Sequence, residues 1–422
     1  MKKKDIFYKN LVVQIFRDHW EQFKIFHSEL VTDDIEENVE KMMGCGLLSN
    51  GHFEYVCPGC LKKRLIGFTC KSRFCLRCSK VYMDKWIEKM RDVVFKWIKH
   101  RHIILTVPGS LWEYFHDPKL LKELADCGVK TIRDVVKICN HGKVLEMGII
   151  RMLQTSGRAS TWNPHLHFLV TEGGLNERGE WQDFYWFEYE TLRKTWMYNL
   201  LGMVKEELGD KREVLEKIDE IYRKRREKGL IARAKKEKVR KRDIVGYLIK
   251  YVASPPIALS RITNYDFETV TYWYREHPTD KKVVVKVSAY EFIRRMIQHI
   301  MSKGFQAVGH YGLYARRKVG KVREQLEELF EGVKEVAQEF QQLLSGLFFP
   351  QNYRGRIKRS FGEDPLFCSQ CKLEMILCKI WHPKYGIIYD LYESGHVVDE
   401  GEICSERFKT EKEVEKQLCF AI

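Results

Sequence analysis

The sequence predicts an α+β fold in which helices flank an antiparallel sheet. Short apolar stretches with a two-residue alternation, at 148–155 and 164–171, are typical of strands. Apolar residues three and four apart predict amphipathic helices within 5–45 and 319–344. Thirteen cysteines, several of them in Cys-x-x-Cys pairs, predict metal sites in a reducing compartment and argue against a disulfide framework.

The chain is long and basic. Its 422 residues are enough for two or three domains with a sizeable core. With 73 Lys and Arg against 58 Asp and Glu, the net charge of +15 favours a polyanionic partner, and nucleic acid is the first choice. No apolar run reaches the ~18 residues of a spanning helix, and residues 1–6 lack the apolar core of a secretion signal. We therefore expect no membrane partner.

Two cysteine knuckles follow the N-terminal helical segment. Cys57 and Cys60 form the first, and Cys75 and Cys78 end the second after the intervening residues 61–74. Knuckles at this spacing are typical of a zinc ribbon, in which each one gives two sulfurs to one tetrahedral ion. Cys70 could replace one of the four thiols. The pattern predicts one structural zinc ion; chance spacing or redox use is the alternative.

Basic residues surround these thiols: Lys62, Lys63, Arg64, Lys71, Arg73, Arg77 and Lys80. A solvated surface would explain them, but basic charge on a zinc ribbon usually fits a phosphate backbone. A further knuckle, Cys368 and Cys371, lies near the other end of the chain. Because no second Cys-x-x-Cys follows it, a degenerate or half-used zinc hairpin is favoured over an intact site there.

A His-x-His pair lies on the strand expected at 164–171. Pro164 suits the first strand position, and the glycines at 173–174 suit a turn. His165 and His167 would leave the same face, about two rises of ~3.3 Å apart, so both could reach one metal ion. Two histidines that only make hydrogen bonds are the alternative.

Gln154 belongs to the strand expected just before this one. An antiparallel pairing of the two strands would bring it near His165 and His167. An amide oxygen is an acceptable ligand for Mg²⁺ or Mn²⁺. A cross-strand hydrogen bond explains Gln154 equally well, so both roles stay open.

The segment 243–256 contains a tyrosine pair. Tyr247 and Tyr251 share a face of the expected helix, Lys250 lies beside them, and two prolines end the helix. Packing is the common role of such a pair. However, a basic run at 223–242 leads into this segment, and the His-x-His pair lies upstream. A solvated helix face or DNA contact would each explain that run.

The tyrosines could act as nucleophiles. A phenol with a reference pKa of ~10 needs a metal to polarise the phosphate and a cation to favour the phenolate. The histidine-bound ion and Lys250 could supply these. Attack on a DNA phosphodiester would give a 5′-phosphotyrosine and a free 3′-OH, and rejoining would need no ATP. The sequence contains no Walker-type phosphate loop, in agreement with this chemistry.

These motifs resemble the HUH single-strand endonucleases of the two-tyrosine class. Segments at 70–78, 103–108, 165–174, 247–261 and 291–312, in this order, resemble the rolling-circle insertion-sequence transposases, over roughly residues 40–375. The resemblance implies His165 and His167 as ligands of a catalytic Mg²⁺ or Mn²⁺, and Tyr247 and Tyr251 as nucleophiles. The family usually has a histidine where Gln154 and its neighbours stand, which leaves the third ligand open.

The resemblance also implies a division of the chain. We expect an N-terminal helical segment (1–45), a zinc-ribbon DNA-binding domain (46–100), an HUH two-tyrosine nuclease domain (101–312) and a C-terminal helix and cysteine-bearing hairpin (313–422). In the nuclease domain, Arg294, Arg295 and His299 on an expected helix could face DNA or solvent.

The implied activity is cleavage and transfer of single-stranded DNA. The implied partners are single-stranded and hairpin element ends and target DNA, with host replication proteins and a second copy of the chain as further candidates. The implied location is the cytoplasm of a prokaryote, at the nucleoid. Two alternatives remain: a plasmid replication initiator or relaxase, which the zinc ribbon disfavours, and a non-catalytic zinc DNA-binding protein.

Overall fold

The computed structural model describes residues 11–391 apart from 77, 80–81, 84–85, 87–89, 91–92, 96, 186, 236–255, 277–278, 330–363 and 365. The chain forms two compact units. The first combines Met1–Met43 with Cys70–Ser360, and the second combines Gly44–Thr69 with Phe361–Ile422. The four-segment division expected from the sequence stays a prediction.

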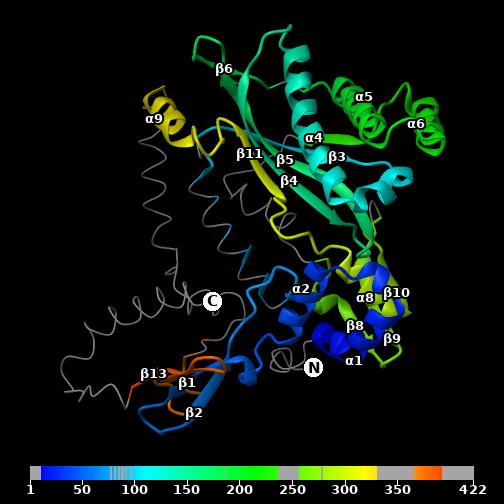
Figure 1. The fold of residues 1–422 in the computed structure, drawn as a ribbon. Helices are drawn as coiled ribbons and strands as arrows, with labels where there is room; N and C mark the ends of the chain where they lie inside the picture. Colours follow the sequence, from blue (N-terminus) through cyan, green and yellow to red (C-terminus); the bar gives the residue numbers. More distant parts are fainter. Residues whose placement is uncertain are drawn as a thin grey trace. The chain divides into compact units, whose positions relative to one another are not determined.

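The first unit is built on a six-stranded antiparallel sheet, which confirms the predicted α+β class (Figure 1). The strand order is β11-β4-β5-β3-β7, and β6 pairs with β5. The strands are β3 (His100–Thr106), β4 (Glu146–Ser156), β5 (Trp162–Leu175), β6 (Trp181–Asp183), β7 (Ala232–Lys235) and β11 (Val308–Gly312).

Both faces of the sheet are covered around β5, which is buried at nearly every position. Leu166 and Phe168 belong to a core that includes residues of α4 (Pro118–Cys139) and α5 (Tyr189–Leu208). Leu169 belongs to a second core, on the opposite face, with residues of α9 (Val319–Leu329). Successive residues of a strand point to opposite faces, so β5 contributes side chains to both cores.

Local signals account for the start of α4. Asp117 is its N-cap, and the carboxylate accepts a hydrogen bond from the backbone N–H of Lys119 at 2.8 Å. Pro118 occupies the first helical position, where its missing N–H costs nothing. The helix therefore begins at a defined residue and carries its apolar stripe onto β5.

A three-stranded sheet and three helices complete the first unit. The sheet order is β10-β9-β8. Its elements are β8 (Ile262–Tyr265), β9 (Thr269–Arg275), β10 (Lys282–Ser288) and α8 (Ala289–Ile297), with α1 (Leu11–Phe26) and α2 (Asp33–Met43). The helices expected within 5–45 are thus confirmed for the part of that segment that the structure describes.

In its described part, the first unit also contains one further helix and three short 3-10 helices. They are η2 (Ser28–Leu30), η4 (Gly109–His116), α6 (Arg212–Arg225) and η5 (Leu259–Arg261).

The second unit is a four-stranded antiparallel sheet made from two distant segments. Its order is β13-β12-β1-β2, so the blue N-terminal strands and the orange C-terminal strands form one sheet (Figure 1). The elements are η3 (Leu48–Asn50), β1 (His52–Val56), β2 (Lys63–Gly67), β12 (Ile376–His382) and β13 (Gly386–Asp390). Strand β1 pairs with β2 on one side and β12 on the other, since Glu54 lies opposite both Leu65 and Lys379.

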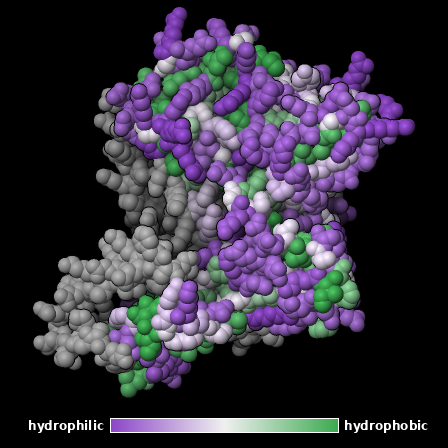
Figure 2. Space-filling model, in the orientation of Figure 1, coloured by the Kyte–Doolittle hydropathy of each residue, from purple (hydrophilic) through white to green (hydrophobic). Residues whose placement is uncertain are grey.

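The visible surface is mostly hydrophilic where it is coloured (Figure 2). Among the described residues, no helix combines the length and the apolar character that crossing a bilayer requires.

Candidate metal and catalytic sites

The histidine pair lies on β5, between β4 and β3. Gln154 of β4 is the cross-strand partner of His165, and Met152 is the partner of His167. On the other side of β5, Ile104 of β3 lies opposite His167. The antiparallel pairing that was predicted to bring Gln154 next to His165 is confirmed.

Hydrogen bonds set the tautomer of His165. Its Nδ1 lies 2.7 Å from the carbonyl oxygen of Asn163, which can only accept, so Nδ1 carries the proton. The lone pair of Nε2 is then available for a ligand. The ring centroids of His165 and His167 are 4.9 Å apart.

Gln154 contacts the second histidine directly. Its Oε1 lies 3.0 Å from Nε2 of His167. This is the hydrogen bond that was one of the two expected roles of Gln154. It is also about the 3.0 Å separation of two adjacent ligands that each lie ~2.1 Å from an octahedral Mg²⁺ ion. The geometry is therefore compatible with either role.

Both imidazoles are held in the form that binds metals. Burial lowers the pKa of His165 below its ordinary value. Burial also lowers the pKa of His167, and the neighbouring His165 and His102 lower it further. Neutral imidazole is the ligand form, so the nitrogen and oxygen atoms at this place fit a divalent cation.

A third histidine, His102 of β3, was missed by the sequence analysis. Its Nε2 lies 3.0 Å from Nδ1 of His167, and both side chains are 3% exposed. The two rings are nearly parallel, with centroids 5.2 Å apart. His102 stands in a strand that the sequence predicts, but only the pairing of β3 with β5 places it beside His167.

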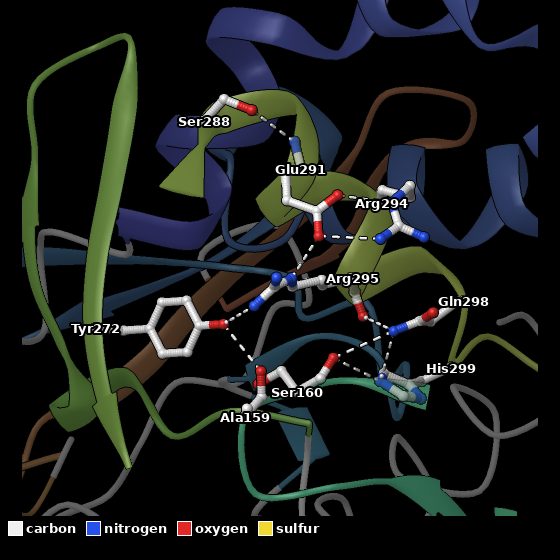
Figure 3. Close-up of polar contacts among 9 residues, drawn as sticks. All are labelled: Ala159, Ser160, Tyr272, Ser288, Glu291, Arg294, Arg295, Gln298 and His299. Carbon is white, nitrogen blue, oxygen red and sulfur yellow. Dashed lines mark hydrogen bonds and ion pairs between the residues drawn. The ribbon is translucent and has the colours of Figure 1, made fainter. Parts of the chain in front are cut away.

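The turn between β4 and β5 is clamped by β9 and α8 (Figure 3). The hydroxyl of Tyr272 donates to the carbonyl oxygen of Ala159 at 2.9 Å and accepts from Nη1 of Arg295 at 2.8 Å. Glu291 in turn accepts from Nε of Arg295 at 2.6 Å. Arg295 therefore supports the turn that precedes His165.

His299 supports the same turn from α8's C-terminal side. Its Nε2 donates to the carbonyl oxygen of Ser160 at 3.3 Å (Figure 3). Its Nδ1 lies 3.1 Å from Oγ1 of Thr155. Burial lowers the pKa of His299 to about 4, so the ring is neutral at pH 7. All three predicted DNA-facing residues thus have intramolecular partners. Arg294 differs in that its side chain is half-exposed while it pairs with Glu291.

The predicted nucleophiles Tyr247 and Tyr251, with Lys250, lie outside the described residues. The described residues on either side of that segment contact residues close to the histidine pair. Lys235 of β7 lies opposite His102, and the carbonyl oxygen of Pro256 accepts from Oγ of Ser160 at 3.0 Å.

The cysteines form two groups. In the second unit, the sulfur atoms of Cys57, Cys60, Cys368 and Cys371 lie within 4.8 Å of one another, and in the first unit those of Cys70, Cys75 and Cys78 are equally close together. None of the described cysteines forms a disulfide. Four thiols at such distances suit a tetrahedral zinc ion.

This grouping corrects two sequence predictions. The knuckle of Cys57 and Cys60 does not share a site with Cys75 and Cys78, and the C-terminal knuckle is not a half-used hairpin. A Cys-x-x-Cys turn offers two thiols without specifying where the other two come from. The pairing of β1 with β12 brings the C-terminal knuckle to the first one, and Cys70, the predicted alternative, is a member of the other group.

The chain thus combines an antiparallel α+β fold, a pair of neutral histidines on β5 and clustered thiols that suit zinc. Comparison with known families agrees. Residues 148–321 match the family described as "Putative transposase", and residues 15–107 match the family described as "Transposase zinc-binding domain". Over these two segments the chain is similar to transposases that carry a zinc-binding domain.

Two relatives cover most of the chain. The transposase for insertion sequence element IS801 of Pseudomonas savastanoi pv. phaseolicola is 29% identical over 81% of this chain and 83% of its own length. The protein named "Putative transposase y4qJ" of Sinorhizobium fredii is 22% identical over 85% of this chain and 92% of its own length. No solved structure matches the chain. The clustered thiols and the match to the zinc-binding family together support structural zinc.

Proposed function

We propose that the protein cleaves and rejoins single-stranded DNA at the ends of an insertion sequence through 5′-phosphotyrosine intermediates. The observation that carries this proposal is the set of His165, His167 and Gln154, of which His167 is buried. These atoms face one another across two strands, with one histidine nitrogen available and one 3.0 Å from an amide oxygen.

The three residues would hold Mg²⁺ or Mn²⁺. When bound, the ion polarises the scissile phosphate and offsets the charge that develops on its oxygens. His165 presents Nε2 because Asn163 holds the proton on Nδ1. His102 is a positioning residue: by accepting a hydrogen bond at Nε2 from the Nδ1–H of His167, it would keep the proton on Nδ1 and turn the lone pair of Nε2 toward the ion.

The chemistry is a phosphoryl transfer. The phenol oxygen of Tyr247 or Tyr251 forms a bond to phosphorus while the bond from phosphorus to the 3′ oxygen breaks. The phenol loses its proton, the 3′ oxygen gains one, and the charge of Lys250 favours the phenolate. A 3′-OH that attacks the phosphotyrosine reverses these steps and joins two strands without ATP. Two tyrosines permit two successive transfers.

The ends of the tyrosine segment support this assignment. Just before this segment, residues 236–255, Lys235 of β7 lies opposite His102. Just after it, the carbonyl oxygen of Pro256 accepts a hydrogen bond from Ser160, in the turn before β5. Tyr251 lies a few residues before Pro256 in the sequence. The described residues at both ends of this segment therefore lie beside the strands that carry His102 and His165.

Binding of element ends and target DNA is proposed for the basic surfaces, in agreement with the net charge of +15. Rolling-circle transposition in the cytoplasm, at the nucleoid and with host replication proteins, follows from the same proposal, as does action by more than one copy of the chain.

A covalent adduct tests the proposal. The protein is incubated with Mn²⁺ and a labelled single-stranded oligonucleotide from an element end, and the products are separated under denaturing conditions. We expect an adduct that is lost when Tyr247 and Tyr251 are both replaced by Phe. Tyr198→Phe is the matched control, because Tyr198 is 71% exposed on α5 and far from β5 in sequence.

Two outcomes contradict the proposal. An adduct that persists in the double variant would place the nucleophile elsewhere. Absence of an adduct with folded wild-type protein that binds the same oligonucleotide would make the chain a non-catalytic DNA-binding protein. An adduct that forms only on a plasmid origin would favour a replication initiator.

A further inference from the structure

Two cysteine knuckles from distant parts of the chain have the same backbone conformation. In the first, the N–H of Leu61 donates to the carbonyl oxygen of Cys57 at 2.9 Å, and the N–H of Cys57 donates to Lys62 at 3.1 Å. Leu61 has a φ of 58°, in the left-handed region that is uncommon for a branched side chain.

The second knuckle repeats this pattern residue for residue. The N–H of Lys372 donates to the carbonyl oxygen of Cys368 at 3.1 Å, the N–H of Cys368 donates to Leu373 at 2.9 Å, and Lys372 has a φ of 57°. Two tight turns of one shape thus each present a pair of thiols.

The four thiols converge. Their sulfur atoms lie within 4.8 Å of one another, and Sγ of Cys60 is 3.6 Å from Sγ of Cys368. Ligands ~2.3 Å from a tetrahedral zinc ion are about 3.8 Å apart. A disulfide would require ~2.05 Å. The spacing therefore suits a shared ion.

Among the described residues, the apolar cluster around these thiols is small. Its buried members are Cys57, Cys368 and Met375, with Tyr55 and Cys60 packed against them. The sheet joins β1 and β2 to β12 and β13, and a hairpin of two strands is marginal alone in water. A unit with so small a core usually requires a metal or disulfides.

We propose that Cys57, Cys60, Cys368 and Cys371 bind one zinc ion, and that this ion joins the two distant segments into a single split zinc ribbon. The match to the zinc-binding family ends at residue 107, so Cys368 and Cys371 lie outside the matched segment. The C-terminal strands are then a required half of the zinc domain.

The assignment predicts the metal content of the full chain. Zinc is counted by mass spectrometry in the wild type and in a Cys368→Ser/Cys371→Ser variant. We expect the variant to lose one zinc per chain. Cys378→Ser is the matched control, because Cys378 is buried in β12 of the same sheet and lies outside both groups. Since the Sγ of Cys378 donates to the carbonyl oxygen of Glu54 at 3.3 Å, serine retains a donor.

Equal zinc content in the double variant and the wild type would overturn the proposal. If the double variant does not fold, alkylation of the wild type decides. Zinc is withdrawn stepwise with a chelator, and the alkylated cysteines are mapped. We expect Cys57, Cys60, Cys368 and Cys371 to become reactive together. Exposure of Cys368 and Cys371 without Cys57 and Cys60, or their reactivity before any zinc is withdrawn, would show that they share no ion.

Discussion

The Nε2 atom of His102 lies 3.0 Å from Nδ1 of His167, between two buried rings on neighbouring strands. Only one proton can occupy this hydrogen bond, so the tautomer of His102 determines which ring nitrogen of His167 carries the proton. His167 also contacts Gln154 through Nε2. A substitution of His102 should therefore change the metal affinity of the candidate site, although His102 does not itself line that site.

The first prediction concerns this relay. His102→Ala should weaken Mn²⁺ binding by about 10-fold or more, because Nδ1 of His167 loses its partner. His102→Gln should restore part of the affinity, since its side chain can still form a hydrogen bond. Free Mn²⁺ is measured by electron paramagnetic resonance in a titration, with circular dichroism to check folding. Equal affinity of His102→Ala and wild type, with Mn²⁺ bound by both, would refute the relay while leaving the nuclease proposal intact.

A second prediction separates the two roles of Gln154. If the amide oxygen is a metal ligand, Gln154→Ala should reduce Mn²⁺ affinity by about 10-fold or more, and Gln154→His should retain it, since imidazole also binds Mn²⁺. If Gln154 only accepts a hydrogen bond from His167, both variants should bind Mn²⁺ like the wild type.

A third prediction tests the clamp on the turn before β5. Arg295→Met removes hydrogen bonds to Glu291 and to the hydroxyl of Tyr272, and should cost about 1.5–3 kcal/mol of unfolding free energy. Arg294→Met is the matched control: its half-exposed pair with the same Glu291 should contribute ~1 kcal/mol or less. Urea unfolding of both variants gives the comparison, and similar losses would argue against the clamp.

Acid should act through His299. Its pKa in the folded state is lowered to about 4 by burial, against 6.5 when it is exposed. The unfolded chain therefore binds the proton more tightly, so this contribution to stability is complete above pH 6.5 and is lost as the pH falls toward 4. It amounts to on the order of 3 kcal/mol. His299→Gln cannot titrate, so its stability should fall less than that of the wild type between pH 6.5 and 4.

The comparison with His299→Gln is needed because acid also protonates zinc-bound thiolates. That loss is common to both proteins and cancels in their difference. Parallel stability curves, measured by urea unfolding at several pH values, would show that His299 does not carry the effect.

A buried ion pair yields the fifth prediction. The side chains of Arg101 and Glu172 are 5% and 7% exposed, with Nη2 2.8 Å from Oε1. Arg101→Met leaves a buried carboxylate unpaired and should destabilise the fold by about 3–5 kcal/mol. Arg212→Met breaks a pair that is 92% and 62% exposed, and should cost ~1 kcal/mol or less. Thermal unfolding distinguishes the two variants, and shifts of similar size would mean that the buried pair is not the cause.

The sequence by itself determined much of the sheet around the histidine pair. Alternation of polar and apolar residues predicted β4 and β5, and the short connection between them predicted their antiparallel pairing, which places Gln154 opposite His165. Neighbouring strands joined by a short turn have few alternatives, so such a contact can be read from local pattern.

Only the tertiary structure decided the contacts between distant segments. His102 reaches His167 because β3 pairs with β5, and the intervening chain leaves that choice open. Likewise, every Cys-x-x-Cys turn offers the same two thiols, so spacing favoured the nearer partner, Cys75 and Cys78. The pairing of β1 with β12 instead joins Cys57 and Cys60 to Cys368 and Cys371, because backbone hydrogen bonds between strands do not depend on their separation in sequence.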